Sequence, residues 1–459
     1  MGLLFAATKS PSLQRQLAHK VAKELSAQWG THVAIKSVQL NGIICMQMDS
    51  ICIDDQSRKP MVNIARVNAK MSPLELMKGK IRIFAANIEK PSFHLYTLHQ
   101  KANYQFLIDS LSKDDGKEKH TIDLKIAQVR LSNGNLRYQN EQQKPLILHK
   151  INGNFSLKEL SDTTLRLHTR QLSFASADGF LLHNATFNLN RHNDTLRISN
   201  ATIELPQSKL DIKATLRAQQ FDATIDGHIT PADLTTFAQQ AKPFNRKLNL
   251  RLQANGSIGN NQTINVSQLD IAEPTGQLSL TASGQYASNH WQANIEQLSV
   301  SNAEMQRLAA LLRPSVNLPE EVLRLGAVRL NGNIQQNGTT LSAMTHLDSE
   351  AGLADITLND NEHQQIIELN TPNLNLGRIL QSADLGIIDG QALIQRQHNQ
   401  QQANIDATLN SIVFRNYNYT NVRAKGTLNQ SFEGNITVND PNLQADATLT
   451  PDNIQAHIA

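Results

Sequence analysis

The amino-acid sequence predicts a mainly β fold, an elongated array of short strands with small helices between groups of strands. The first observation behind this prediction is the stretch 248–286, where apolar residues alternate with Asn, Gln, Ser and Thr. Side chains along a strand point to opposite faces in turn, so Leu248, Leu250 and Leu252 share one face. The same alternation returns at Leu278 and Leu280. The pattern is typical of a meander of strands with one apolar side.

The second observation is repetition along the chain. The stretch 330–358 repeats the order of residues in 254–282, with Asn331-Gly332 in the place of Asn255-Gly256. We interpret each Asn-Gly pair as a turn between two strands. Another marker recurs at 230–234, 301–305 and 371–376, at intervals of about 70 residues. In each case a Ser or Thr that can cap a helix ends a strand, which predicts a short helix there.

The N-terminal region predicts one longer helix. The apolar segment 1–7 is far shorter than the ~20 residues that cross a bilayer, so it is either an ordinary start or the end of a membrane helix that begins outside this chain. Ser10-Pro11 and Gly30 are start and stop signals. Between them, every fourth residue is apolar: Leu13, Leu17, Val21, Leu25 and Trp29. This amphipathic helix either caps the open end of a sheet or lies on a membrane surface.

The remaining chain predicts further strands with few interruptions. Asn133-Gly134 predicts a hairpin between 129–131 and 136–138, Asp54-Asp55 predicts a turn, and 73–77 predicts a short helix. The clearest further alternating runs lie at 210–216, 405–409 and 443–449. Their apolar faces consist of Leu210, Ile212, Ala214 and Leu216, of Ile405, Ala407 and Leu409, and of Leu443, Ala445 and Leu449.

Composition and motifs argue against several classes of function. A net charge of +3, with no basic stripe interleaved with aromatic residues, argues against nucleic-acid binding. Cys45 and Cys52 stand at an odd offset, which places them on opposite faces of a strand and predicts buried free thiols. The sequence has no phosphate loop, no nucleophile elbow and no His or Cys set at metal-binding spacing. His183, His192 and His228 are isolated in polar stretches. We therefore expect no enzyme, no cofactor and no metal.

Several stretches resemble the AsmA-like superfamily, and within it most closely the TamB group, the translocation and assembly module subunits of Gram-negative envelopes. The resemblance covers nearly all of the chain and is carried by the stretches 10–40, 126–139, 318–335 and 373–382. It implies a remnant of a membrane anchor and an amphipathic helix in 1–30 and an N-terminal AsmA-like β region in 31–225. It implies a repetitive β groove in 226–459 that is truncated at its C-terminal side.

The resemblance also implies a function. Members of the family form folded-over antiparallel or mixed sheets, anchored in the inner membrane and spanning the periplasm. They are implicated in carrying phospholipid to the outer membrane and in the assembly of outer-membrane proteins, and a C-terminal domain absent here engages an outer-membrane barrel partner. The expected ligands are phospholipid acyl chains, and the expected groove lining is the apolar set Leu210, Ile212, Ala214, Leu216, Leu248, Leu250, Leu252, Leu278, Leu280, Ile405, Ala407, Leu409, Leu443, Ala445 and Leu449.

Alternating runs alone do not separate a groove from the dry core of a sandwich or β-helix, because both bury one face of each strand. Three classes of function therefore stand at this point. The first is a lipid conduit, and the second is a scaffold that offers sheet edges to barrel proteins or autotransporters during assembly without carrying lipid. The third is a polysaccharide-active β-helix enzyme, for which the sequence offers no carboxylate or basic cluster.

Overall fold

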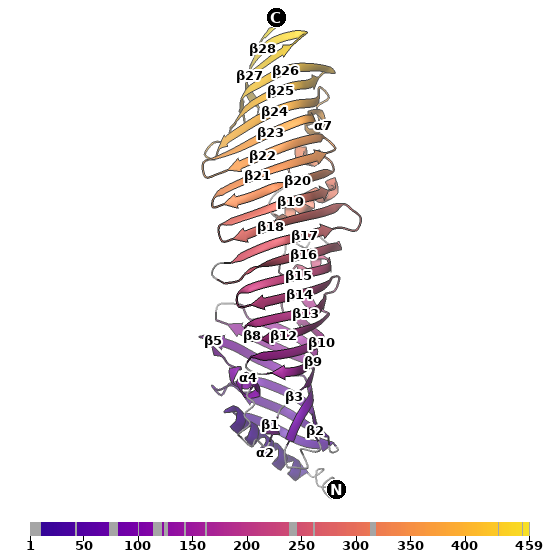
Figure 1. The fold of residues 1–459 in the computed structure, drawn as a ribbon, viewed down its shortest axis with the longest axis vertical. Helices are drawn as coiled ribbons and strands as arrows, with labels where there is room; N and C mark the ends of the chain where they lie inside the picture. Colours follow the sequence, from indigo (N-terminus) through magenta and orange to yellow (C-terminus); the bar gives the residue numbers. More distant parts are fainter. Residues whose placement is uncertain are drawn as a thin grey trace. The chain divides into compact units, whose positions relative to one another are not determined.

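A computed structural model describes residues 11–41, 44–72, 81–99, 101–112, 122–123, 127–141, 144–160, 163–237, 246–259, 262–312, 318–429, 431–451 and 453–458. The chain divides into two compact units, Met1–Ala218 (unit 1) and Gln219–Ala459 (unit 2). Mostly antiparallel strands dominate both units, so the predicted mainly β fold with short interspersed helices is confirmed (Figure 1). The apolar segment 1–7, the predicted helix 73–77 and the charged stretch 113–120 lie outside the described residues.

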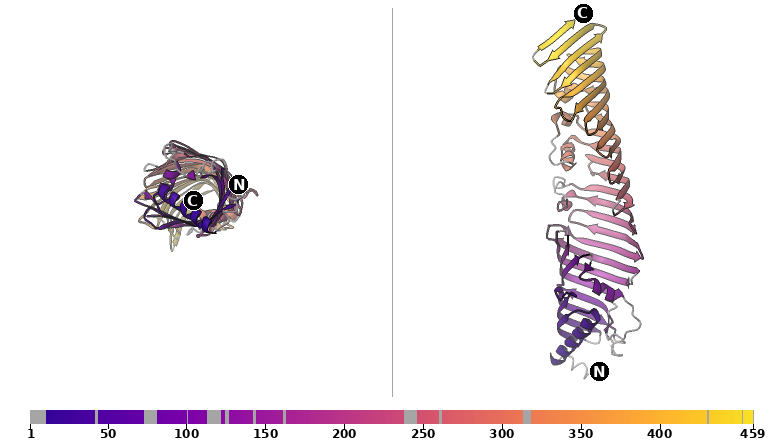
Figure 2. Two further views of the ribbon diagram at one scale, coloured as in Figure 1. Left: turned by 90° about the horizontal axis from the view of Figure 1, so that it is seen from below. Right: turned by 90° about the vertical axis from the view of Figure 1, so that its left-hand side faces the viewer.

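Unit 1 begins with helix α2 (Pro11–Trp29), the amphipathic helix that the sequence predicts. Val21 and Leu25 of its apolar stripe are buried and Trp29 packs beside them, while the side chains of Leu13 and Leu17 lie outside the described set. The stripe packs into one cluster with strands β1 (Val33–Asn41), β2 (Cys45–Asp54) and β3 (Pro60–Met71). The helix thus caps the sheet of unit 1 (Figure 2, left), and because the described residues of its apolar stripe pack on that sheet, the structure favours the cap over a helix lying on a membrane.

The sheet of unit 1 contains parallel as well as antiparallel strand pairs. Strands β4 (Ile81–Glu89) and β5 (Ser92–Leu98) lie end to end, antiparallel to β3 on one side and parallel to β8 (Gln128–Asn140) on the other. A parallel pair needs a crossover connection, and this one contains α4 (Gln105–Ser112). Two-residue strands β6 (Lys101-Ala102), β7 (Ile122-Asp123) and β11 (Leu181-Leu182) pair at the sides. The later strands are antiparallel: β9 (Leu146–Leu160), β10 (Thr164–Ser176), β12 (Asn184–His192), β13 (Thr195–Glu204) and β14 (Lys209–Arg217).

Unit 2 is an antiparallel meander in which each described strand pairs with the next. At ~4.8 Å per strand the meander extends for about 65 Å. Its strands are β15 (Gln220–Ile229), β16 (Leu248–Ser257), β17 (Thr263–Ala272), β18 (Leu278–Ala287), β19 (His290–Val300), β20 (Val328–Asn337), β21 (Thr340–Ser349), β22 (Gly352–Asp360), β23 (Gln364–Asn375), β24 (Leu385–Gln397), β25 (Ala403–Phe414), β26 (Tyr417–Leu428), β27 (Phe432–Asp440), β28 (Leu443–Thr450) and β29 (Asn453–Ile458).

The Asn-Gly pairs do not form the turns that the sequence predicts. Asn255-Gly256 lies inside β16, and Asn331-Gly332 lies inside β20. A Cβ atom on Gly256 would lie 2.0 Å from the carbonyl oxygen of Thr263, and one on Gly332 would lie 2.1 Å from that of Met344. Glycine is therefore required there because the backbone of the next strand approaches too closely for any side chain.

The predicted hairpin at Asn133-Gly134 is also wrong. Strand β8 runs through this pair, and its pairing with β9 shifts register on both sides of Gly134. Asn133 has a φ of 52°, a left-handed conformation that asparagine tolerates better than most residues. The pair therefore marks a β-bulge, for which the local sequence signal is the same as for a tight turn.

Two of the three predicted helix starts are confirmed, and the third is wrong. Thr230 precedes the short 3₁₀ helix η1 (Pro231–Leu234), and Ser301 precedes α5 (Asn302–Leu312), where the amide of Met305 donates to the carbonyl of Ser301. Thr371-Pro372 instead lies inside β23 at a register shift. Helix α7 (Leu376–Leu380) begins after Asn375, whose side chain accepts a hydrogen bond from the amide of Arg378.

Cys45 and Cys52 are free thiols, as predicted, but both are half-buried, so the prediction that they are buried is wrong. The prediction that they face opposite sides is wrong. Before Ser50, which has a φ of 50°, the buried residues of β2 are Met46 and Met48; after it they are Ile51 and Ile53. Because the alternation reverses at Ser50, both cysteines belong to the less buried face.

Candidate functional site

The apolar faces of successive strands in unit 2 join into continuous rows of cross-strand neighbours. Such directly opposed residues have Cβ atoms about 4.5–5.5 Å apart. One row, the central file, takes one residue from every strand of the meander and contains no charged residue. It consists of Ile225, Leu252, Leu269, Ala282, Ile295, Gly332, Thr345, Ile356, Leu369, Ala392, Ala407, Ala424, Ile436, Ala447 and Ala456.

A second row, the lateral file, runs beside the first and contains only apolar residues and glycine. Its members are Ala223, Ala254, Val266, Gly284, Ala293, Ile334, Ala343, Leu358, Ile367, Ile394, Ile405, Gly426, Gly434, Leu449 and Ile454. We call the two files together the apolar track. A register shift interrupts the pairing at several strands, for example between Val266 and Leu269, yet both files continue across it.

The track is not packed as a dry core. Every member on β15 to β28 is half-buried, and those on β29 are exposed. In the amino-terminal cluster of unit 1, by contrast, Val38 is 0% and Met46 is 1% exposed. An apolar face beneath a second packed layer would reach values of that kind. Within unit 2, the described residues therefore leave an apolar surface that remains accessible along the meander.

Short helices cover one margin of this surface. Met305 and Leu308 of α5 pack on the buried Leu248, Leu278 and Val300. One repeat farther along, Leu376 and Ile379 of α7 pack with Leu325 on the buried group Ala351, Leu374 and Ile388. Helix α5, drawn in salmon, lies to one side of the strands of unit 2 (Figure 2, right). Because the short helices occupy the connections after β15, β19 and β23, one margin of the track is built every fourth strand.

Charged residues fix the helices at this margin. The carboxylate of Glu304 on α5 is buried, 3.1 Å from Arg246 Nη1 and 2.8 Å from Arg307 Nη1. Glu273, in the turn before β18, accepts hydrogen bonds from the hydroxyl and the amide of Thr275, and the hydroxyl is the main cause of its lowered pKa. Helix α7 is held in a similar way, by an ion pair between Arg378 and Glu350. These charges are satisfied within the margin and do not enter the track.

A buried carboxylate lies at the turn between β27 and β28. Asp440 at the end of β27 is 3% exposed and accepts from the amides of Asn442 and Thr420 and the hydroxyls of Tyr417 and Thr420. The hydrogen bond from the Asn442 amide is the largest contribution, and together they lower the pKa of Asp440 to about 2 from an ordinary value of 3.8.

Ionised Asp440 is expected to stabilise unit 2 fully above about pH 4, and this stabilisation is lost as the pH falls through about 2, where the folded protein takes up the proton. The Asp440→Asn variant is expected to be less stable than the wild type at neutral pH and to lack this acid-dependent loss. Urea unfolding followed by fluorescence of Trp291 measures both effects. Asp446→Asn, at an exposed position on β28, is the control. Parallel acid profiles for the wild type and Asp440→Asn would contradict the prediction.

The residues of unit 2 that were predicted to line a groove fall into four groups. Leu252, Ala407, Ile405 and Leu449 belong to the track, and Leu250, Leu280, Leu409 and Ala445 lie on the same face in half-buried positions. Leu248 and Leu278 share this face but are buried beneath α5, so neither side chain is open. Leu443 lies opposite Asp440 at the margin. That these positions contact acyl chains stays a prediction.

In unit 1, Leu210, Ile212, Ala214 and Leu216 line one face of β14 and are half-buried. Ala214 ends a file of neighbours in which Leu157, Leu167, Leu189 and Ile198 precede it. The apolar files therefore occur in both units, each described by itself.

Sequence reasoning missed most of the track between β19 and β24. Ile334, Ile356, Ile367 and Ile394 are members, and the first two stand in alternating runs, whereas Ile367 and Ile394 each follow another apolar residue. The same period-two signal that identified Leu250 and Leu252 was available for the first two. It was obscured where a bulge changes the alternation, as between Ile295 and Leu298.

The site described above is an apolar surface. Among the described residues, no group of three or more His, Cys, Asp or Glu side chains is placed to hold a metal ion. None of the described helices combines the length and the apolar character needed to cross a membrane. A comparison with protein-family models matches the AsmA family over residues 27–459. No curated protein and no solved structure matches the chain.

Proposed function

The chain belongs to the AsmA family, and from that premise we propose that it carries phospholipid between the inner and outer membranes, with acyl chains on the apolar track. The family is associated with envelope assembly and lipid transport. The single observation that carries the proposal is that the central and lateral files continue through the meander, uncharged and half-buried. In this proposal no covalent bond is made or broken, so the protein is not an enzyme and needs no cofactor.

The energetic argument starts from the lipid. Exposing an acyl chain to water costs about 0.8 kcal/mol per methylene, so a chain of about 16 carbons costs on the order of 12 kcal/mol. An uninterrupted apolar surface removes much of this cost wherever the chain lies. Ala, Gly, Leu and Ile offer no group that binds one lipid position more tightly than the next. Each step along the track is therefore close to neutral in free energy, and the lipid meets no deep trap.

The location of the protein in the cell envelope and its partner are part of the same proposal. By analogy with the TamB group, the protein would be anchored in the inner membrane, lie in the periplasm and be linked to outer-membrane protein assembly. It would also have a barrel partner in the outer membrane. These elements rest on family membership alone, whereas the track rests on the residues described above.

Photocrosslinking tests where lipid binds. A photoreactive residue in place of Leu369, in the central file, is expected to form adducts with phospholipid during expression in a Gram-negative host. The same residue in place of Asn370, an exposed position on the opposite face of β23, is the matched control and is expected to form none. Mass spectrometry of the purified protein detects the adducts and any lipid that copurifies. Adducts with barrel-protein segments and none with lipid would favour the scaffold over the conduit.

A further inference from the structure

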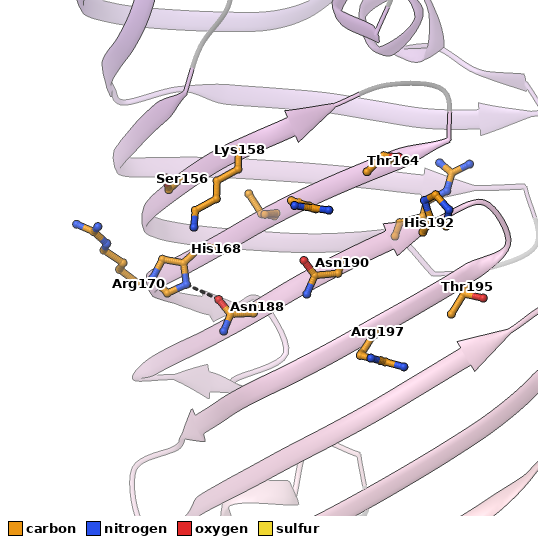
Figure 3. A pocket seen from close by; sticks show the side chains of 13 residues that line it. Ser156, Lys158, Thr164, His168, Arg170, Asn188, Asn190, His192, Thr195 and Arg197 are labelled. Carbon is orange, nitrogen blue, oxygen red and sulfur yellow. Dashed lines mark hydrogen bonds between the residues drawn. The ribbon is translucent and has the colours of Figure 1, made fainter.

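The polar face of the sheet in unit 1 has a hollow lined by basic residues. It has a volume of about 900 Å³ and lies over β9, β10, β12 and β13 (Figure 3). Lys158, Arg166, Arg170 and Arg197 line it, together with His168. We call these five residues the basic hollow. Polar neutral side chains fill the spaces between them: Asn188, Asn190, Thr164 and Thr195.

The cations of the hollow are mostly unpaired. Arg166 lies 3.2 Å from Glu159, but Lys158, Arg170 and Arg197 have no carboxylate within ion-pair distance among the described residues. The polar face of unit 2 differs: Arg251 lies 2.9 Å from Asp226, and Arg423 and Lys425 both lie within 3.7 Å of Asp406. Cations whose charge is not compensated within the protein attract an anion from outside.

The charge of the whole chain hides a separation between the units. Residues 1–218 contain 30 Lys and Arg against 18 Asp and Glu, a net charge of +12, whereas residues 219–459 contain 13 against 22, a net charge of −9. The total of +3 is therefore the small difference between a basic and an acidic unit. An anionic surface attracts unit 1 and repels unit 2.

The cross-strand register places hydrogen-bond donors of three neighbouring strands side by side. Arg166 and Arg197 are the direct neighbours of Asn190 on either side, so one amide stands between two guanidinium groups. His168 Nδ1 lies 2.6 Å from Asn188 Oδ1; since that oxygen only accepts, the histidine donates and the amide NH₂ group of Asn188 is directed elsewhere. Guanidinium and amide donors are the groups that recognise phosphate oxygens.

We propose that the basic hollow docks unit 1 on a bilayer surface by binding the phosphate groups of anionic phospholipids. No Phe, Tyr or Trp lines the hollow, so the large aromatic platforms on which successive bases stack are missing from its lining, and this argues against single-stranded nucleic acid. The choice of lipid as the source of phosphate rests on the proposed function, whereas the binding of an anion follows from the unpaired cations.

Vesicle binding by the full chain tests the proposal. The wild type is expected to sediment with vesicles of phosphatidylcholine containing about one third phosphatidylglycerol, and not with phosphatidylcholine alone. Each Lys or Arg near an anionic surface contributes about fivefold in affinity, so Arg166→Gln/Arg170→Gln/Arg197→Gln is expected to bind about 100-fold more weakly. The control Arg251→Gln/Arg329→Gln/Arg423→Gln removes the same charge from unit 2 and is expected to lose far less affinity than the variant of the hollow. Circular dichroism verifies that both variants are folded, and Arg197→Gln alone gives a smaller loss in the same direction.

Three results would overturn the proposal. The first is equal vesicle binding by the wild type and the variant of the hollow. The second is binding of inorganic phosphate that depends on the hollow while the wild type binds vesicles equally with and without phosphatidylglycerol, which would make the ligand free phosphate. The third is a variant of the hollow that no longer binds an oligonucleotide bound by the wild type, while its vesicle binding equals that of the wild type. Lipid adducts at Leu369, measured on the same preparation, report on the track separately. Vesicle binding that depends on the hollow without such adducts would retain the docking and reject the conduit.

Discussion

Two carboxylates placed across β25 are expected to slow lipid transfer by about 100-fold. Ile405 belongs to the lateral file, and Leu409 lies on the same face four residues farther along the strand. With Ile405→Asp/Leu409→Asp, an acyl chain passing β25 loses apolar contact with about four methylenes, which at about 0.8 kcal/mol each adds about 3 kcal/mol to the barrier. Transfer of a labelled phospholipid between donor and acceptor vesicles, in the presence of the purified chain, measures the rate.

The opposite face of the same strand provides the matched control. Asn404 and Thr408 are exposed, and Asn404→Asp/Thr408→Asp adds the same charge to β25 without touching the track. The control is expected to transfer lipid at the wild-type rate. The track variant is expected to retain bound lipid elsewhere on the meander, because only one strand of many is altered. Equal rates for the two variants would show that lipid does not pass β25.

The strands of the track could be predicted from the sequence because their signal is local. Leu248, Leu250 and Leu252 alternate with polar residues, and a strand places them on one face whatever lies around it. The helix α2 was equally accessible, since Pro11 at its start and the spacing of Val21 and Leu25 are properties of a single segment. Both predictions needed no knowledge of the neighbouring strands.

Predictions that depend on neighbouring strands failed. Asn331-Gly332 carries the signal of a hairpin turn, but its glycine is required by the carbonyl of Met344 on the next strand. Thr371-Pro372 carries the signal of a helix start, but β23 continues to Asn375 before the helix begins. In both cases the local sequence is compatible with a strand and with another structure, a turn or a helix start, and pairing with another strand decides between them.

Alternation also could not show whether the apolar face is buried in a core or open to solvent. A sealed core and an open track require the same residues at the same spacing. Leu278 and Leu280 illustrate this, since they are adjacent members of one face, yet α5 buries the first and leaves the second half-exposed. The position of α5 depends on contacts such as that between Glu304 and Arg246, which the sequence does not reveal.

One charged substitution in each environment separates a sealed core from an open track. Val38 in the cluster of unit 1 is fully buried, so Val38→Asp places a carboxylate where no water reaches it and is expected to cost unit 1 about 4 kcal/mol or more. Leu369 is half-buried in the central file, so the carboxylate of Leu369→Asp reaches solvent and is expected to cost unit 2 about 1 kcal/mol.

The two tryptophans make this comparison possible in one chain. Trp29 packs in the cluster of unit 1, and Trp291 lies on β19 of unit 2. With Trp291→Phe as background, fluorescence during urea unfolding reports on unit 1; with Trp29→Phe it reports on unit 2. If Leu369→Asp destabilised unit 2 as strongly as Val38→Asp destabilises unit 1, the track would be a sealed core with no room for acyl chains. A small loss at Leu369 beside a large one at Val38 is what a surface built to receive lipid requires, because such a surface contributes little to folding until the lipid covers it.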